Sequence, residues 1–236
     1  MPVPGPGPIL LLTRPRAAAQ RFAAQVGLQI ETLIAPLLQI DLLDIAPQTD
    51  DLRGIILTSE NGALAAGRIA GLPRPAWCVG ARTAQAAKDQ GFAPLSADGN
   101  ADDLIALILL RHESGPLLHL HGEHVRGDIA QRLITAGVAA RSIPAYSQTS
   151  RALAPEAVAA FAGQRPIVLP LFSPRTVTIL AEYGPFNAPL HIVPISAVVA
   201  DVARMLHPAS TVLSDAPDAD AMVRAVRTSV LSVSSK

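Results

Sequence analysis

The sequence is poor in several residue types that commonly build functional sites. It has one cysteine, Cys78, which excludes an intramolecular disulfide and any CxxC metal or redox motif. Only Lys88 and Lys236 are lysines among its 19 basic residues, so recognition of a carboxylate would depend on arginine or on backbone N–H groups. Aromatic residues make up 3% of the chain, so each tyrosine stands out.

The chain also lacks a net charge and a long apolar run. Acidic and basic residues number 19 each, and this balance argues against non-specific nucleic-acid binding, which depends on positive charge. No stretch approaches the roughly 18 consecutive apolar residues of a membrane span. The opening MPVPGPGP has neither the basic region nor the apolar helix of a signal peptide. We therefore expect a cytoplasmic protein that binds neither nucleic acid nor membranes.

What is present is a regular alternation of short apolar runs and amphipathic stretches in a chain that is 50% apolar. This alternation indicates repeated βα units, and hence an α/β fold with parallel sheets covered by helices on both faces. Its 236 residues suffice for one large domain or two ordinary ones. Strands are expected at residues 9–13, 28–34, 54–58, 76–80, 117–121, 167–172, 190–195 and 211–214, and helices at 16–26, 60–69, 82–90, 102–111, 125–136, 155–163, 174–183, 197–206 and 218–230.

An internal repeat points to two similar lobes. Ser59 and Ser173 each follow a predicted strand and open a predicted helix. The next strand ends at Gly80, 21 positions after Ser59, and at Ser196, 23 positions after Ser173. Two segments, 34–53 and 141–149, do not fit the βα alternation and are natural crossovers. The predicted division is a discontinuous lobe of residues 1–36 and 150–236, an inserted lobe of residues 40–146, and linkers near 35–40 and 144–150.

Several hydroxyl residues lie at predicted helix starts, where free N–H groups and the positive end of the helix dipole can bind an anion. Ser59, Ser173 and Ser196 occupy such positions, and Thr83 lies in the first helical turn after Gly80. The alternative is ordinary N-capping, for which serine and threonine are favoured in any helix. Convergence of several such starts on one cleft would favour anion binding.

The segment HLHGEH is the most metal-like cluster. His119 and His121 share one face of a predicted strand, followed by His124, but only Glu123 accompanies them as an acidic ligand. We therefore favour strand-end residues partly exposed at a lobe surface, and we predict no metal. Cys78 lies in an apolar strand and is interpreted as a core residue rather than a nucleophile.

Two further side chains have two interpretations each. Tyr146 lies in a predicted linker, where a phenol is either a packing anchor or a weak acid that faces the cleft. Arg14 follows the first strand and points either to an anionic ligand or to solvent.

The ordered set of motifs resembles the uroporphyrinogen-III synthase family over residues 8 to 230. The similar segments are LLTRP (11–15), ILTSENGA (56–63), VGARTAQAAKDQGF (79–92), HLHGEHVRGDIAQRLITAG (119–137), AY (145–146), LFSPRTV (171–177) and ISAVVADVA (195–203). The resemblance implies two α/β lobes joined by a two-stranded linker, with the active site in the cleft between them.

The resemblance also implies a lyase of tetrapyrrole biosynthesis, on the route to haem, sirohaem and cobalamin, that needs no cofactor. Its substrate would be hydroxymethylbilane, which loses its hydroxyl as water and closes with inversion of ring D to uroporphyrinogen III. We expect a monomer, and hand-over of the substrate from hydroxymethylbilane synthase is consistent with this reaction. The alternative is a non-catalytic two-lobed protein that binds a tetrapyrrole or another polycarboxylate.

The family's residues correspond to particular positions of this sequence. Its tyrosine corresponds to Tyr146, the predicted acid, and its threonine to Thr83. Many members have a hydroxyl residue where this chain has Val199, and Ser196 is the candidate replacement. The predicted substrate-binding set is Arg14, Ser59, Gly80, Thr83, Ser173 and Ser196.

Overall fold

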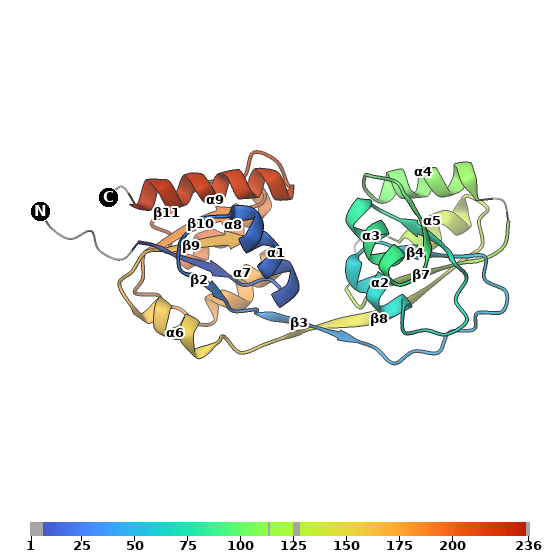
Figure 1. The fold of residues 1–236 in the computed structure, drawn as a ribbon, viewed down its shortest axis with the longest axis horizontal. Helices are drawn as coiled ribbons and strands as arrows, with labels where there is room; N and C mark the ends of the chain where they lie inside the picture. The colour runs from blue at the N-terminus through green and yellow to red at the C-terminus, as the bar shows by residue number, and fades with distance from the viewer. Residues whose placement is uncertain (1–6, 113, 125–127, 235–236) are drawn as a thin grey trace, which may run out of the picture. The chain divides into compact units, whose positions relative to one another are not determined.

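The structure, a computed structural model, describes residues 7–112, 114–124 and 128–234 (Figure 1). The chain divides into two compact units. Unit 1 comprises the described residues of Met1–Gln39 and Ser150–Lys236, and unit 2 comprises those of Ile40–Thr149. The chain passes between the units twice, within strand β3 (Leu38–Leu42) and at the end of strand β8 (Ala140–Ser150).

Unit 1 is built around a five-stranded sheet of order β11-β10-β9-β1-β2, in which every adjacent pair is parallel. Parallel neighbours require crossover connections, and helices supply them. The elements are β1 (Ile9–Leu12), α1 (Arg16–Val26), β2 (Thr32–Ile34), α6 (Pro155–Ala162), β9 (Ile167–Leu171), α7 (Pro174–Ala181), β10 (Leu190–Pro194), α8 (Ala197–Ala203), a 3₁₀ turn (Arg204–Leu206), β11 (Ser210–Thr211) and α9 (Ala219–Ser234).

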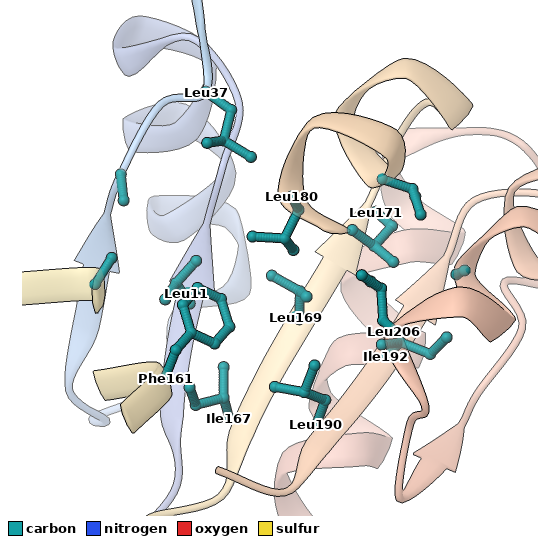
Figure 2. Packing of buried hydrophobic residues seen from close by; sticks show 14 of the residues in the cluster. Leu11, Leu37, Phe161, Ile167, Leu169, Leu171, Leu180, Leu190, Ile192 and Leu206 are labelled. Atoms are coloured by element: carbon teal, nitrogen blue, oxygen red, sulfur yellow. The ribbon is translucent and has the colours of Figure 1, made fainter. Parts of the chain in front are cut away.

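Helices cover both faces of this sheet, which explains the all-apolar strand sequences (Figure 1). Leu10 and Leu12 pack with α1 and α9 on one face. Leu11, between them, points to the other face and packs with residues of α6, α7 and α8, such as Phe161 and Leu180 (Figure 2). Successive side chains of a strand alternate between faces, so a run of buried leucines serves two cores at once.

Unit 2 contains a six-stranded sheet of order β3-β8-β7-β4-β5-β6. Four pairings are parallel, whereas β3 runs antiparallel to β8, because Leu43 N–H donates to Ala145 O and Arg151 N–H donates to Leu37 O. The remaining elements are β4 (Gly54–Leu57), α2 (Glu60–Ala66), β5 (Pro75–Cys78), α3 (Ala81–Asp89), β6 (Ala93–Ser96), α4 (Ala101–Arg111), β7 (Leu117–Gly122) and α5 (Ile129–Thr135).

The two units share one topology with a circular shift of the chain. Strands β4, β5 and β6 of unit 2 correspond to β9, β10 and β11 of unit 1, and β7 and β8 correspond to β1 and β2. Helices α2 and α3 then correspond to α7 and α8. Ser59 and Ser173 therefore occupy equivalent helix starts, and this is the repeat detected in the sequence.

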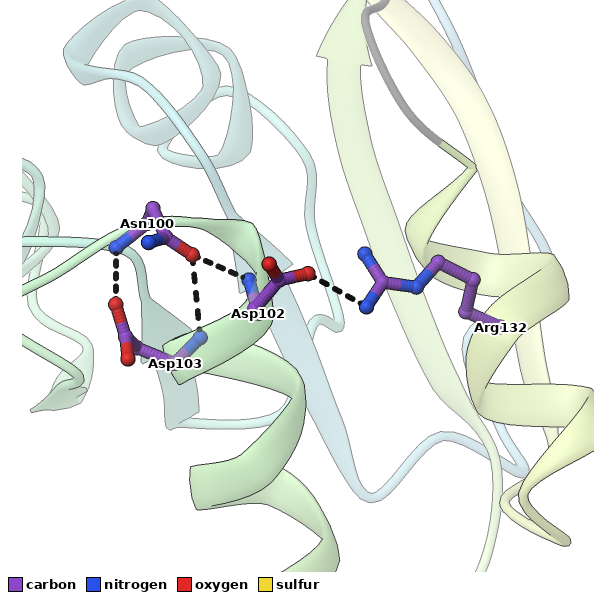
Figure 3. Close-up of polar contacts among 4 residues, drawn as sticks. All are labelled: Asn100, Asp102, Asp103 and Arg132. Atoms are coloured by element: carbon purple, nitrogen blue, oxygen red, sulfur yellow. Dashed lines mark hydrogen bonds and ion pairs between the residues drawn. The ribbon is translucent and has the colours of Figure 1, made fainter.

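Helices α4 and α5 cover one face of the unit 2 sheet, and polar contacts hold their first turns (Figure 3). Asn100 Oδ1 accepts from the N–H groups of Asp102 at 2.7 Å and Asp103 at 3.4 Å, while the Asp103 carboxylate accepts from Asn100 N–H at 2.8 Å. Arg132 of α5 pairs with Asp102 at 2.6 Å. This pair is exposed and adds about 1 kcal/mol at most, so the capping box is the main device that positions the start of α4.

The predicted α/β class and the order of the elements that were predicted are confirmed, with several local corrections. The strand expected at 211–214 is only Ser210–Thr211 (β11). Strand β6 was missed, and β2 occupies only the last three residues of the predicted strand 28–34. Residues 141–149 form part of strand β8, with a register shift opposite His121 and Gly122, rather than a segment outside the sheets. Residues 125–127 of the predicted helix 125–136 lie outside the described residues, and α5 begins at Ile129. Within the described residues, no helix is long and apolar enough to cross a membrane.

Candidate active site

A small pocket of about 160 Å³ lies at the carboxyl edge of the unit 2 sheet. Strands β4, β7 and β8 bring Thr58, His119, His121 and Tyr146 to its wall, and the first residues of α4 and α5 complete it. The carboxyl ends of parallel strands meet at one edge of a sheet, which is where ligands bind in folds of this kind. This edge is therefore the candidate active site within unit 2.

The Tyr146 side chain is held in this pocket by strand pairing. Gly122 of β7 pairs with Tyr146, whereas the preceding His121 pairs with Pro144, so Ala145 is an extra residue that marks a β-bulge. Tyr146 is only 8% exposed, and its hydroxyl lies 2.9 Å from Ser59 Oγ at the start of α2. The structure thus brings together the predicted acid and one predicted binding residue.

His119 belongs to the pocket wall, and the sequence-based expectation for its exposure was wrong. It was expected to be partly exposed, but it is 1% exposed, because α4 and α5 cover this face of β7. Its Nε2 lies 3.4 Å from Thr58 Oγ1. Burial, the largest cause, and the charge of His121 together lower the pKa of His119 from 6.5 to about 4, against the opposing effect of Asp128. His119 is therefore neutral at pH 7.

This shift predicts how stability depends on pH. The unfolded chain takes up the His119 proton near pH 6.5, but the folded protein resists protonation down to about pH 4. The resulting stabilisation is complete above pH 6.5 and is lost as the pH falls to 4, about 3 kcal/mol in all. In His119→Asn, the free energy of unfolding measured by urea denaturation should fall correspondingly less between pH 7 and pH 4. The exposed His207→Asn is the control, and an unchanged pH dependence in His119→Asn would contradict the prediction.

The start of α3 differs from the other helix starts at this edge. Its N-cap is Gly80, which has no side chain to occupy the first N–H groups of the helix. Thr83, in the first turn, is 5% exposed. A Cβ at Gly80 would meet nothing within 4 Å, so the space before α3 is open. These N–H groups are therefore available to an anion.

In unit 1, the predicted binding residues lie at the equivalent edge of the sheet. Ser173 caps α7 and accepts from Thr176 N–H at 3.2 Å, while Pro174 contributes no N–H. Ser196 caps α8. The Arg14 guanidinium stacks on the Phe172 ring, 4.0 Å from its centroid. Stacking fixes the orientation of this cation beside the start of α7.

Comparison with known proteins decides the family. A family model described as "Uroporphyrinogen-III synthase HemD" matches residues 20–224, which is most of the chain. The chain belongs to the uroporphyrinogen-III synthase family. A direct comparison with curated protein sequences gives no significant match.

Solved structures of uroporphyrinogen-III synthases are similar to this chain. The enzyme from Helicobacter pylori is 15% identical with a TM-score of 0.67, covering 98% of this chain and 100% of that one. A mutant enzyme from the extremely thermophilic bacterium Thermus thermophilus is 16% identical with a TM-score of 0.46, covering 96% and 100%. A further Thermus thermophilus structure is 17% identical with a TM-score of 0.36, covering 94% and 99%. The Helicobacter comparison supports the fold of this chain.

The predicted function and enzyme class are confirmed at the level of the family, a group of lyases in tetrapyrrole biosynthesis. The metal-dependent alternative gains no support, since no group of three or more His, Cys, Asp or Glu among the described residues could hold a metal ion.

Burial raises the pKa of the Cys78 thiol to about 12, so this residue remains a thiol in the core. In this uroporphyrinogen-III synthase family member, Val199 is 2% exposed and packs in the unit 1 core.

Sequence reasoning overlooked three residues of the candidate site. Thr58 lines the pocket beside His119, and two glycines, Gly62 and Gly122, allow Ser59 and Tyr146 to approach each other. Thr58 and Gly62 lie in the segment ILTSENGA, and Gly122 lies in HLHGEH. The motifs that carry the family resemblance therefore already included the overlooked residues. The close contacts themselves were not visible in either segment.

Proposed function

We propose that this chain converts hydroxymethylbilane to uroporphyrinogen III, with Tyr146 as the acid that assists loss of the hydroxyl group. The observation that supports this role is the buried Tyr146 phenol, held against Ser59 at the carboxyl edge of the sheet in a member of this family. A phenol is a weak acid, suited to a leaving group that needs only one proton.

The proton and electron balance of this step is simple. The C–O bond of the hydroxymethyl group breaks, and its electron pair leaves with oxygen. That oxygen takes the Tyr146 proton and departs as water, while the adjacent pyrrole nitrogen supplies electron density to the carbon. A later loss of a proton from the cyclised product restores the phenol. The acid is thus regenerated in each turnover.

We propose that the substrate carboxylates bind at the helix starts. Gly80 and Thr83 supply the uncapped N–H groups of α3, and Ser173, Ser196 and Arg14 mark the corresponding edge of unit 1. Eight carboxylates need many donors, and backbone N–H groups provide them without adding net charge to a neutral chain. Such donors can hold the substrate carboxylates while ring D is inverted.

Isomer analysis tests the proposed function directly. Free hydroxymethylbilane closes without inversion to the type I isomer, so selection of type III depends on positioning of the substrate. The purified protein should divert hydroxymethylbilane from type I to type III. Binding without diversion would favour the non-catalytic alternative, which the family match does not favour.

The uncapped start of α3 gives a further prediction. Gly80→Asp places a carboxylate over these N–H groups, in open space and on an extended backbone (φ −159°) that any residue adopts. The helix should be slightly stabilised, because Asp is a better N-cap than Gly. The KM for hydroxymethylbilane should nevertheless rise on the order of tenfold, because like charges repel. Gly80→Ser, a neutral cap, is the matched control and should raise KM less; equal KM values in both variants would argue against carboxylate binding here.

A further inference from the structure

Ser59 makes two contacts with its hydroxyl group. It is the N-cap of α2, and its Oγ accepts from Gly62 N–H at 3.0 Å. The same oxygen lies 2.9 Å from the Tyr146 hydroxyl. A serine hydroxyl has one proton and two lone pairs, and the cap occupies one lone pair. Its proton and its second lone pair are the two groups that can meet the phenol.

Two glycines keep the phenol next to Ser59. A Cβ on Gly122 would lie 2.7 Å from Cε2 and 2.8 Å from Cζ of the Tyr146 ring, so only glycine leaves room for the ring against β7. A Cβ on Gly62 would lie 2.8 Å from the Leu120 carbonyl oxygen, so the start of α2 also depends on close approach to β7. Strand β7 therefore fixes both partners of the Ser59–Tyr146 contact.

We propose that Ser59 is a positioning residue for the acid, and that its hydroxyl donates to the Tyr146 phenol oxygen. This inference rests on the proposed role of Tyr146. With the phenol as acceptor, its own proton stays available to the substrate hydroxyl. When that proton has moved, the Ser59 hydroxyl already donates to the phenolate, so no rearrangement is needed at that moment. The opposite direction would bind the acidic proton to serine and oppose its transfer.

This assignment changes the role expected for Ser59. As a helix-start residue it was a candidate for carboxylate binding, but its oxygen is occupied by the Gly62 N–H and the Tyr146 phenol. It would then act on the reaction only through Tyr146. Its effect should appear in kcat rather than in KM, because the substrate carboxylates would not contact it.

A spectroscopic experiment tests the direction of the hydrogen bond without any substrate. The chain has two tyrosines, so Tyr183→Phe leaves Tyr146 as the only phenol. The tyrosine Fermi doublet in the ultraviolet resonance Raman spectrum distinguishes a phenol that accepts from one that donates. We expect an accepting phenol in Tyr183→Phe, and loss of that signature when Ser59→Gly is added. Glycine is nearly as good an N-cap as serine, so α2 should remain folded.

Asp218→Ala is the matched control, because it removes a side-chain acceptor of the Ala221 N–H at the start of α9, which belongs to unit 1, whereas Tyr146 belongs to unit 2. In the Tyr183→Phe background it should leave the doublet unchanged. A donating phenol in Tyr183→Phe, or a doublet that does not respond to Ser59→Gly, overturns the inference. Neither result depends on activity, so this failure is separate from failure of the proposed function.

A double-mutant cycle tests whether Ser59 acts through Tyr146. Ser59→Ala should lower kcat about 10- to 100-fold with little change in KM, as expected for a lost hydrogen bond to a developing charge. Ser59→Thr, which keeps the hydroxyl, should restore most of the rate. In a Tyr146→Phe background, Ser59→Ala should cost nothing further. A full additional loss in that background would assign Ser59 a direct contact with the substrate and overturn the positioning role.

Discussion

Tyr146→Phe is expected to lower the rate of uroporphyrinogen III formation about 10- to 100-fold. General-acid catalysis typically contributes about 10²–10⁴-fold, and a smaller contribution is expected here because the pyrrole ring already assists departure of the hydroxyl. The ring would keep its packing against Gly122, so the free energy of unfolding should change little. Type III formation, resolved from type I, is the measurement.

Tyr183→Phe is the matched control for this variant. Tyr183 is the other tyrosine of the chain and belongs to unit 1, where its hydroxyl accepts from Leu153 N–H at 3.1 Å. This substitution removes one phenolic hydroxyl of the same kind but should leave the type III rate unchanged. A Tyr146→Phe protein with an unaltered rate would remove Tyr146 from the mechanism.

Gly122→Ala is expected to be the most damaging single-carbon change in the site. The new Cβ would lie 2.7 to 3.1 Å from Cε2, Cζ and the hydroxyl oxygen of Tyr146, so the phenol must shift. Overpacking of this kind typically costs about 1–3 kcal/mol of stability. Displacement of an acid by about 1 Å can cost on the order of 10²-fold in rate. Urea denaturation and isomer-resolved kinetics measure the two effects.

The stability part of this prediction has an internal control. In a Tyr146→Ala background the ring that opposes the new Cβ is absent, so Gly122→Ala should cost little additional stability. Activity should not recover in the double variant, because the phenol is gone. If the stability cost persisted without the ring, the contact between Gly122 and Tyr146 would not be its source.

Local features of the fold followed from the sequence because their causes are local. Ser59, Ser173 and Ser196 were recognised at helix starts, and each accepts from an N–H three residues later. Buried strands such as β4 were recognised from short apolar runs. The repeat of βα units was visible for the same reason, because equivalent strands and helix starts recur at similar spacing.

Edge strands were harder to recognise because few buried side chains define them. Strand β6 has the sequence APLS, contains Pro94, and alternates between exposed and half-exposed residues. Strand β2 is three half-exposed residues long at the other sheet's edge. Neither carries the continuous apolar run that identifies a central strand, so their boundaries depend on backbone pairing with a neighbour.

The sequence by itself determined the α/β class, the helix starts and, through ordered motifs, the family, and it singled out Tyr146 as the candidate acid. Only the tertiary structure placed Tyr146 against Ser59, which is 87 positions away in the chain. It also buried His119 beneath α4 and α5. Both outcomes depend on how β7 pairs with β8 and packs under helices, including the bulge at Ala145. Local periodicity identifies the apolar positions of each helix and strand, but it does not predict which distant side chains come into contact. Those contacts depend on strand order, register and packing.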